Sequence, residues 1–308
     1  MTIQRTPEHE RSTGARPAGI TTEQAAAANV QQMFDTIAPT YDRANHLLSA
    51  GIDRWWWNRT ARLFRPVLQH PETVALDLCC GTGDMTLALL KHRPKSPFKD
   101  NPKESSKQDG KEGGKGGSQE RGKEAVILSE ALSERSESKG GVEGPAVVLP
   151  APILAVDFSH QMLSLGQKKF APHNIIAIEA DALHLPLADA SVDLVTSAFG
   201  FRNLANYEEG LAELHRILRP GGQLGILEAN QPEGLTGTLY NLYFKNILPR
   251  LGGLISGKPA AYSYLPASVE RFPRPPRMLQ LIKNAGFTNA SWTSYTFGTA
   301  GLYHASKP

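Results

Sequence analysis

A glycine-rich loop between two short apolar runs constrains the fold of this chain more than any other stretch. Residues 77–84, Asp-Leu-Cys-Cys-Gly-Thr-Gly-Asp, follow the apolar run 74–76 and lead into residues 85–90, Met-Thr-Leu-Ala-Leu-Leu. A strand that turns on glycines directly into a helix exposes backbone at the carboxyl edge of a parallel sheet, where nucleotide-like ligands bind. The loop therefore predicts an α/β fold with a cofactor site at Gly81 and Gly83. The alternative is a turn that only connects a strand to a helix.

The residues of the loop indicate which cofactor to expect. A dinucleotide fingerprint requires a third glycine where this chain has Thr86, so a pyrophosphate is disfavoured. Asp77 and Asp84 stand on either side of the loop, and these acids would repel phosphate and attract a cation. S-adenosylmethionine carries a sulfonium and an ammonium group, and we therefore expect it as the ligand.

The composition of the chain indicates which molecules it is expected to bind and in which cellular compartment it is expected to work. The 308 residues include 33 Lys and Arg against 30 Asp and Glu, with no dense basic stretch, so nucleic acid is not an expected partner. The two cysteines, Cys79 and Cys80, are adjacent and lack other ligands at metal-binding spacing, so neither a disulfide framework nor a metal site is expected. No apolar run reaches the ~18 residues that span a bilayer, and no signal-peptide core is present. We expect a cytoplasmic protein whose residues 1–28 form a disordered tail.

Residues 94–150 differ in composition from the sequence on either side. They are rich in Lys, Glu, Gly and Ser and have too few apolar residues for a core, which predicts a low-complexity disordered insertion. Spacing supports this prediction, because Asp157 ends the apolar run 153–157 and is the candidate ribose-binding acid. Such an acid usually follows the glycine loop by about 20 residues, and omitting the insertion leaves about 17 between Gly83 and Asp157.

Apolar runs and helical patterns alternate along the rest of the chain. Ser159 is a candidate helix cap, and residues 220–222, Pro-Gly-Gly, predict a turn into a strand. The last two strands are close enough to form a hairpin. The pattern predicts a Rossmann-like, mostly parallel sheet of seven strands with one antiparallel edge strand and helices on both faces. After the loop we expect strands at 153–157, 174–181, 191–199, 223–228, 290–297 and 300–305, and helices at 159–170, 207–218 and 277–285.

With Asp157, residues 181–182 (Asp-Ala) and the turn at 220–222, the sequence resembles class I S-adenosylmethionine methyltransferases. Residues 33–55 and 197–203, the latter Ser-Ala-Phe-Gly-Phe-Arg-Asn, are similar to the ubiquinone/menaquinone biosynthesis C-methyltransferase family. That family methylates a ring carbon of a prenylated quinol, and the similarity covers about residues 29–93 and 151–308. The resemblance implies a single methyltransferase domain at 29–308, with an N-terminal helical lid at 29–70 and an apolar cap at 232–272.

The resemblance also assigns cofactor contacts. It places Thr82 in the loop, Asp157 on the ribose, and Asp181 and Ala182 beside the adenine; Asp77, Gly81 and Gly83 complete the expected site. Two positions depart from the family pattern. This chain has Ala198 where the family usually has a serine, and whether Ser197 replaces that serine is left open. It has Asp53 where the family commonly has a histidine.

For the chemistry, the resemblance points to Arg202 and Asn203. A guanidinium group cannot readily act as a base, so we expect Arg202 to bind the phenolate that forms as the quinol hydroxyl loses its proton. Tyr41 and Asp42 are candidates for orienting that hydroxyl. The alternative for Arg202 is a surface ion pair with Glu208 or Glu209, and the alternative for Tyr41 is packing within the lid.

The resemblance favours demethylmenaquinol as the substrate and places the methoxy-benzoquinol precursor of ubiquinone second. A methyltransferase for another small lipid or phenol, and a cofactor-binding scaffold subunit without turnover, stay open as alternatives. Because a prenyl tail suits an apolar cap and resides in a bilayer, transient membrane contact at the inner face is a hypothesis. A membrane role for Trp55, Trp56 and Trp57 and formation of a homodimer are also left open.

Overall fold

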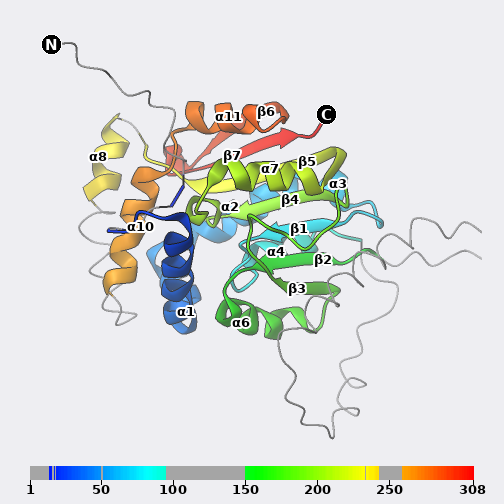
Figure 1. The fold of residues 1–308 in the computed structure, drawn as a ribbon, viewed down its shortest axis with the longest axis horizontal. Helices are drawn as coiled ribbons and strands as arrows, with labels where there is room; N and C mark the ends of the chain where they lie inside the picture. The colour runs from blue at the N-terminus through cyan, green and yellow to red at the C-terminus, as the bar shows by residue number, and fades with distance from the viewer. Residues whose placement is uncertain are drawn as a thin grey trace, which may run out of the picture.

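Seven strands form one sheet in the order β3-β2-β1-β4-β5-β7-β6 (Figure 1). The computed structural model describes residues 14, 15, 17, 19–49, 51–94, 150–232, 234–242 and 259–308. The strands are β1 (Ala75–Leu78), β2 (Ile153–Asp157), β3 (Ile175–Glu179), β4 (Val192–Ala198), β5 (Leu218–Ala229), β6 (Thr288–Tyr295) and β7 (Ala300–Ser306). The helices are α1 (Glu23–Leu48), α2 (Ile52–Leu63), α3 (Arg65–Leu68), α4 (Asp84–Leu90), α6 (His160–Phe170), η1 (Phe201–Asn203), α7 (Tyr207–Ile217), α8 (Gly234–Leu242), α10 (Pro259–Arg271), α11 (Pro275–Asn284) and η3 (Thr296–Gly298).

The predicted fold class is confirmed. Strands β1 to β5 pair in parallel, and the C-terminal hairpin adds β7 and β6 at one side of the sheet. Strand β7 runs antiparallel to both β5 and β6, and lies between them. Its residues are mostly buried whereas those of β6 are mostly exposed, so the more apolar strand of the hairpin takes the inner position.

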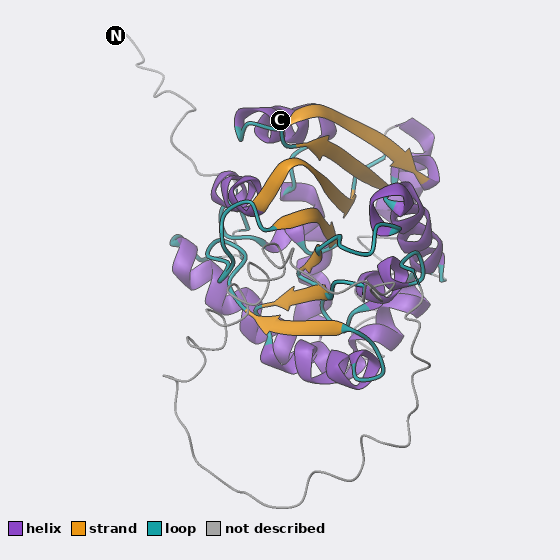
Figure 2. Cartoon of the chain, turned by 90° about the vertical axis from the view of Figure 1, so that its right-hand side faces the viewer, coloured by secondary structure: helices purple, strands orange, loops and turns teal. Residues whose placement is uncertain are grey.

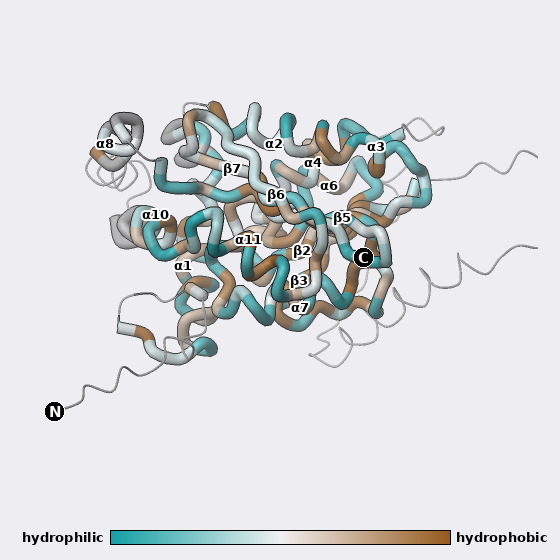
Figure 3. The backbone as a smooth tube through the Cα atoms, turned by 90° about the horizontal axis from the view of Figure 1, so that it is seen from above, coloured by the Kyte–Doolittle hydropathy of each residue, from teal (hydrophilic) through white to brown (hydrophobic). Residues whose placement is uncertain are grey.

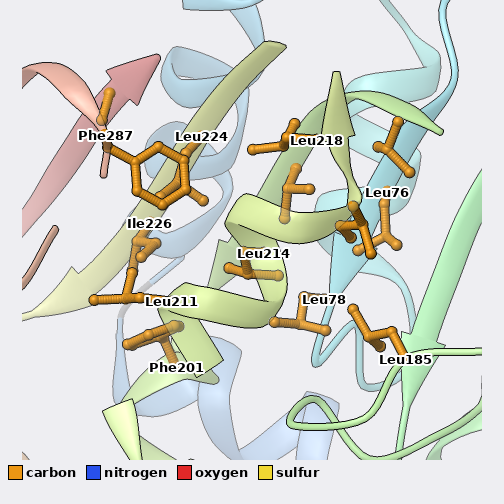
Figure 4. Packing of buried hydrophobic residues seen from close by; sticks show 14 of the residues in the cluster. Leu76, Leu78, Leu185, Phe201, Leu211, Leu214, Leu218, Leu224, Ile226 and Phe287 are labelled. Carbon is orange, nitrogen blue, oxygen red and sulfur yellow. The ribbon is translucent and has the colours of Figure 1, made fainter. Parts of the chain in front are cut away.

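Helices cover both faces of the sheet, as Figure 2 shows. Helices α2, α4 and α6 lie on one side and α7 on the other (Figure 3). On the α7 side, Leu211 and Leu214 belong to one buried cluster with Leu224 and Ile226 of β5 and Leu76 of β1 (Figure 4). Burial of such apolar side chains on both faces stabilises a parallel sheet. No helix in the described parts of the chain is both long and apolar enough to cross a bilayer.

The first helix begins earlier than the sequence predicts. Residues 23–28, assigned above to a disordered tail, form the first turns of α1, and the Thr22 hydroxyl accepts a hydrogen bond from the Ala25 N–H at 3.3 Å. Farther upstream, Ala15 is buried and its N–H donates to the Leu204 carbonyl at 2.8 Å. Apolar contacts and helix capping therefore order part of a segment whose composition alone predicts disorder. Residues 1–13 lie outside the described residues.

The two ends of the predicted insertion lie side by side. Arg93 is buried, and its guanidinium donates to the carbonyls of Thr73 and Ala151, which lie just before β1 and β2. Residues 95–149, nearly all of the predicted insertion, lie outside the described residues. Arg93 and Ala151, on either side of these residues, are thus held together at the amino ends of β1 and β2.

Candidate active site

A cavity of about 340 Å³ opens where the parallel strands end, and its size is typical of small-molecule sites. Helices α1, α8 and α10 gather at this end of the sheet (Figure 1). They contribute Tyr41, Tyr240 and Leu265 to the cavity wall, while the glycine loop contributes Gly81 and Thr82. Two smaller cavities of about 40 Å³ each share lining residues with it, among them Cys79. The carboxyl edge of the sheet, where the sequence predicts the cofactor site, therefore has a cavity of suitable size.

The two glycines of the loop have different roles. Gly81 has φ +56°, and a Cβ there would meet no atom within 4 Å, so its backbone faces open space that a ligand can occupy. Gly83 has φ +91°, and a Cβ there would lie 2.1 Å from the ring of Phe170 on α6. Gly81 therefore leaves room for a ligand, and Gly83 allows α6 to pack against the loop.

Two buried carboxyls stand beneath the loop. Asp77 accepts hydrogen bonds from the hydroxyls of Thr86 at 2.6 Å and Thr196 at 3.1 Å, and burial raises its pKa to about 7. Asp157 accepts from the N–H groups of Gly81 at 2.8 Å and Ser159 at 2.9 Å; burial raises its pKa to about 6 even though these bonds favour the ionised form. The structure thus brings the predicted ribose acid into contact with the glycine loop.

The remaining predicted cofactor residues line the smaller cavities. Asp157, Asp181 and Ala182 share one of them, and the Asp181 carboxylate accepts from the Leu183 N–H at 3.0 Å. Ala198 lines both the large cavity and the other small one. Ser197 lines none of these cavities, and its buried hydroxyl has no hydrogen-bond partner among the described residues. The structure therefore gives Ser197 no contact with the cavities at which the sequence predicts the cofactor.

Arg202 is buried and forms an ion pair with Glu228, one residue before the end of β5. Its Nη1 lies 2.6 Å from Glu228 Oε1, and its Nε donates to the Ser268 hydroxyl at 3.3 Å. The backbone N–H of Arg202 donates to Glu228 Oε2 at 3.0 Å. Burial lowers the pKa of Arg202, but the Glu228 carboxylate more than offsets this, so the pKa lies above its ordinary value. The alternative of a surface pair with Glu208 or Glu209 is thus wrong.

Arg202 and Asn203 face different cavities, although the sequence predicts that they act as a pair. Arg202 lines the large cavity, whereas Asn203 lines the two small ones, one of them shared with Tyr41. Both residues belong to η1, whose tight turn separates the directions of neighbouring side chains. The Asn203 amide oxygen accepts from the Tyr264 hydroxyl at 3.2 Å. Asn203 therefore lies on the side of the site where the sequence predicts the cofactor.

A polar network joins α1 to the glycine loop. The Asp42 carboxylate accepts from the Thr82 hydroxyl at 2.6 Å and from Lys169 Nζ at 2.9 Å, and Lys169 also reaches Asp84 at 3.2 Å. Nearby, His46 Nδ1 and Asp53 Oδ2 are 2.7 Å apart, and Asp53 lines the large cavity. These contacts hold α1, which carries Tyr41, over the loop.

The donor set fits S-adenosylmethionine. Asp77 and Asp84 line the cavity at the two ends of the loop, although Asp84 is paired with Lys169, and Asp157 lies beside Gly81, which faces open space. Burial raises the pKa of Cys79 and Cys80, so both thiols are neutral. In the described part of the chain, no group of three or more His, Cys, Asp or Glu side chains is arranged to hold a metal ion.

Sequence reasoning missed Glu228 and Lys169. Glu228 ends the predicted strand 223–228, at the edge of the sheet where the ligand is expected. The neighbouring strand, β4, precedes Arg202, so the position of Glu228 in the sequence could have identified it as a site residue. Lys169 lies in the last turn of α6, and no local pattern marks it.

Known proteins resemble this chain along most of its length. The sequence model described as the ubiE/COQ5 methyltransferase family matches residues 21–307. The chain is 36% identical over 281 residues to a demethylmenaquinone methyltransferase of Deinococcus radiodurans, covering 90% of this chain and 92% of the relative. It is 35% identical over 279 residues to a demethylmenaquinone methyltransferase of Thermus thermophilus, and the alignment covers 90% of this chain and 100% of the relative.

Solved structures share the fold at low sequence identity. The crystal structure of an S-adenosylmethionine-dependent methyltransferase of Thermotoga maritima, described as a possible histamine N-methyltransferase, aligns with a TM-score of 0.51 at 14% identity. The alignment covers 91% of this chain and all of the other. At this identity the likeness establishes the fold and says nothing about the methyl acceptor.

Proposed function

We propose that this chain transfers a methyl group from S-adenosylmethionine to a ring carbon of demethylmenaquinol. The premise is that the chain belongs to the ubiE/COQ5 methyltransferase family. The observation that carries this proposal is a single cavity in which a cofactor loop meets a buried cation. Gly81 and Thr82 line it on one side, and Arg202 lines it on the other. S-adenosylmethionine supplies an electrophilic methyl group when it is bound. The residues of this chain must align the ring carbon with that group and stabilise the charge that develops on the ring oxygen.

Arg202 is suited to stabilise that charge. Its Nη1 and Nε are engaged by Glu228 and Ser268, and among the described residues no hydrogen bond is formed by Nη2. The ion pair fixes the guanidinium before substrate binds, and burial strengthens its interaction with a phenolate. Because the guanidinium stays protonated, the proton of the quinol hydroxyl passes to another acceptor.

Tyr41 and Asp42 act from α1. Tyr41 lines the large cavity and is our candidate for orienting the quinol hydroxyl. Asp42 is bound to Thr82 and Lys169, which favours a positioning role: it fixes the helix that carries Tyr41. Asn203, on the cofactor side, is proposed to contact the nucleoside together with Asp157, Asp181 and Ala182.

The outer wall of the large cavity suits a prenylated ring. Trp56, Phe199, Leu265 and Val269 line it, and apolar and aromatic side chains of this kind bury a hydrocarbon chain well. Of the predicted cap at 232–272, residues 233 and 243–258 lie outside the described residues. We place the enzyme in the cytoplasm, working at the inner face of the membrane that holds its substrate. A lid formed by residues 29–70 is part of the same proposal.

Quinone analysis of a strain that lacks the protein tests the substrate. The proposal predicts accumulation of demethylmenaquinone and its loss on complementation. Accumulation of a demethylated methoxy-benzoquinone would instead assign the protein to ubiquinone synthesis. An unchanged quinone pool would contradict both assignments.

A second experiment separates the enzyme from a scaffold that only binds the cofactor. Arg202→Lys keeps a cation beside Glu228 but removes the planar guanidinium. We expect methyl transfer to fall by about 100-fold while affinity for S-adenosylhomocysteine stays within about threefold of the wild type. A wild-type protein that binds S-adenosylhomocysteine and transfers no methyl group to any quinol would favour the scaffold.

A further inference from the structure

Exposed apolar side chains lie on α2 and η3, two elements that also contribute residues to the wall of the large cavity. In the described residues, five large hydrophobic side chains are exposed, and three of them belong to α2. A fourth, Phe297 in η3, is 84% exposed, the largest fraction of the five. We define the α2–η3 patch as Ile52, Trp55, Leu63 and Phe297 together with the arginines Arg54, Arg59 and Arg62.

Direct contacts bring α2 and η3 together. The Trp55 ring meets that of Tyr295 edge to face with 5.8 Å between centroids, and Trp56 Nε1 donates to the Thr296 hydroxyl at 2.8 Å. Ile52, Trp56 and Thr296 also line the large cavity. The patch is therefore continuous with the wall of the active site.

Phe297 adopts an unfavourable conformation in an unfavourable environment. Its φ of +55° lies in the left-handed region that residues other than glycine seldom adopt, and its ring faces water. Neither feature contributes to packing in the described fold. Exposed apolar groups that cluster in this way usually mark a binding surface.

The exposed charged side chains of α2 are all arginines. Arg54, Arg59 and Arg62 are exposed, and the Arg59 guanidinium lies 5.1 Å from the centre of the Trp55 ring. Asp53 is the only acid of α2, and it is buried against His46. Residues 288–298, which form β6 and η3, contain no charged side chain. Tryptophan and phenylalanine flanked by arginine are suited to the headgroup region of an anionic bilayer.

We propose that the α2–η3 patch docks on the surface of an anionic lipid bilayer, with Phe297 and Trp55 inserted among the headgroups. The choice of a bilayer over a second protein copy rests on the positive charge and on the proposed prenylated substrate. Docking turns the mouth of the large cavity towards the lipid, so the quinol ring enters the site while its tail stays in an apolar environment. The patch is separate from the residues assigned to cofactor binding and chemistry.

Flotation with lipid vesicles tests the proposal on the full chain. Vesicles of phosphatidylcholine with phosphatidylglycerol should bind the wild type, and vesicles of phosphatidylcholine alone should bind it at least tenfold more weakly. Phe297→Ser with Trp55→Ser, and separately Arg54→Gln with Arg62→Gln, should each reduce binding about tenfold or more. The matched control is Arg277→Gln with Lys283→Gln on α11, which covers the opposite face of the sheet and should bind as the wild type does.

Three results would overturn the proposal: a wild type that does not bind anionic vesicles, patch variants that bind as well as the control, or a dimer in sedimentation experiments that Phe297→Ser dissociates. The last result would assign the patch to a second copy of the chain. Activity on a short-chain quinol in the absence of lipid separates this proposal from the proposed function. Phe297→Ser should leave that activity unchanged, whereas a wild type that binds vesicles and methylates no quinol would contradict only the function.

Discussion

Replacing Glu228 with glutamine leaves the Arg202 guanidinium buried without its charge partner. In the structure Arg202 and Glu228 side chains are 6% and 0% exposed, and the shortest contact between them is 2.6 Å. Removing one member of such a pair costs about 3–5 kcal/mol because the remaining charge stays desolvated. We therefore expect Glu228→Gln to lower the free energy of unfolding by that amount, measured by urea denaturation near pH 7.5. Methyl transfer should fall as well, because the glutamine no longer fixes the cation.

Two further variants make this prediction specific. Arg202→Met combined with Glu228→Gln removes both charges and should recover at least half of the lost stability, although activity stays low. Glu209→Gln, on the exposed start of α7, is the matched control and should change stability by at most about 0.5 kcal/mol. An exposed ion pair contributes at most about 1 kcal/mol to the free energy of unfolding. A smaller loss than this for Glu228→Gln would refute the claim that Arg202 is desolvated and fixed before substrate binds.

Other predictions concern the cofactor site and the insertion. Because burial raises the pKa of Asp157 to about 6 and the carboxylate is the form that accepts ribose hydroxyls, calorimetry should show affinity for S-adenosylhomocysteine falling up to tenfold per unit below pH 6. Asp157→Asn should bind weakly and lack this dependence, and a pH-independent wild type would contradict the assignment. Gly83→Ala should lose about 2–3 kcal/mol in urea unfolding because its Cβ meets the Phe170 ring. Gly81→Ala should cost only about 1 kcal/mol but weaken S-adenosylhomocysteine binding by about tenfold or more, and equal effects of the two alanines would be inconsistent with their separate roles. Replacement of residues 95–149 by a short Gly-Ser linker should preserve folding and methyl transfer, and loss of either would show that this segment contributes to the fold or the site.

The parts of the site that local sequence determines could be predicted. The glycine loop, the acid at the end of β2 and the Ser159 cap each depend on a few neighbouring residues, and the Ser159 hydroxyl indeed accepts from the Met162 N–H at 3.1 Å. The parallel order of strands follows from alternating strands and helices. These predictions needed no knowledge of which strands become neighbours.

The parts that depend on tertiary contacts could not be predicted in the same way. Arg202 and Glu228 lie on segments that meet only because β4 and β5 pair. Lys169 meets Asp42 across 127 positions of sequence because α6 packs against α1. The directions of Arg202 and Asn203 depend on the tight turn of η1, which no periodicity in the sequence indicates.

Transfer of an isotopically labelled methyl group tests the central claim most directly. The purified full chain would be incubated with methyl-labelled S-adenosylmethionine and a reduced short-chain demethylmenaquinone, and the product analysed by mass spectrometry and NMR. The proposed function predicts label on the ring carbon beside a hydroxyl, with one S-adenosylhomocysteine formed per methyl group. Label on oxygen, or no transfer by protein that binds S-adenosylhomocysteine, would contradict it.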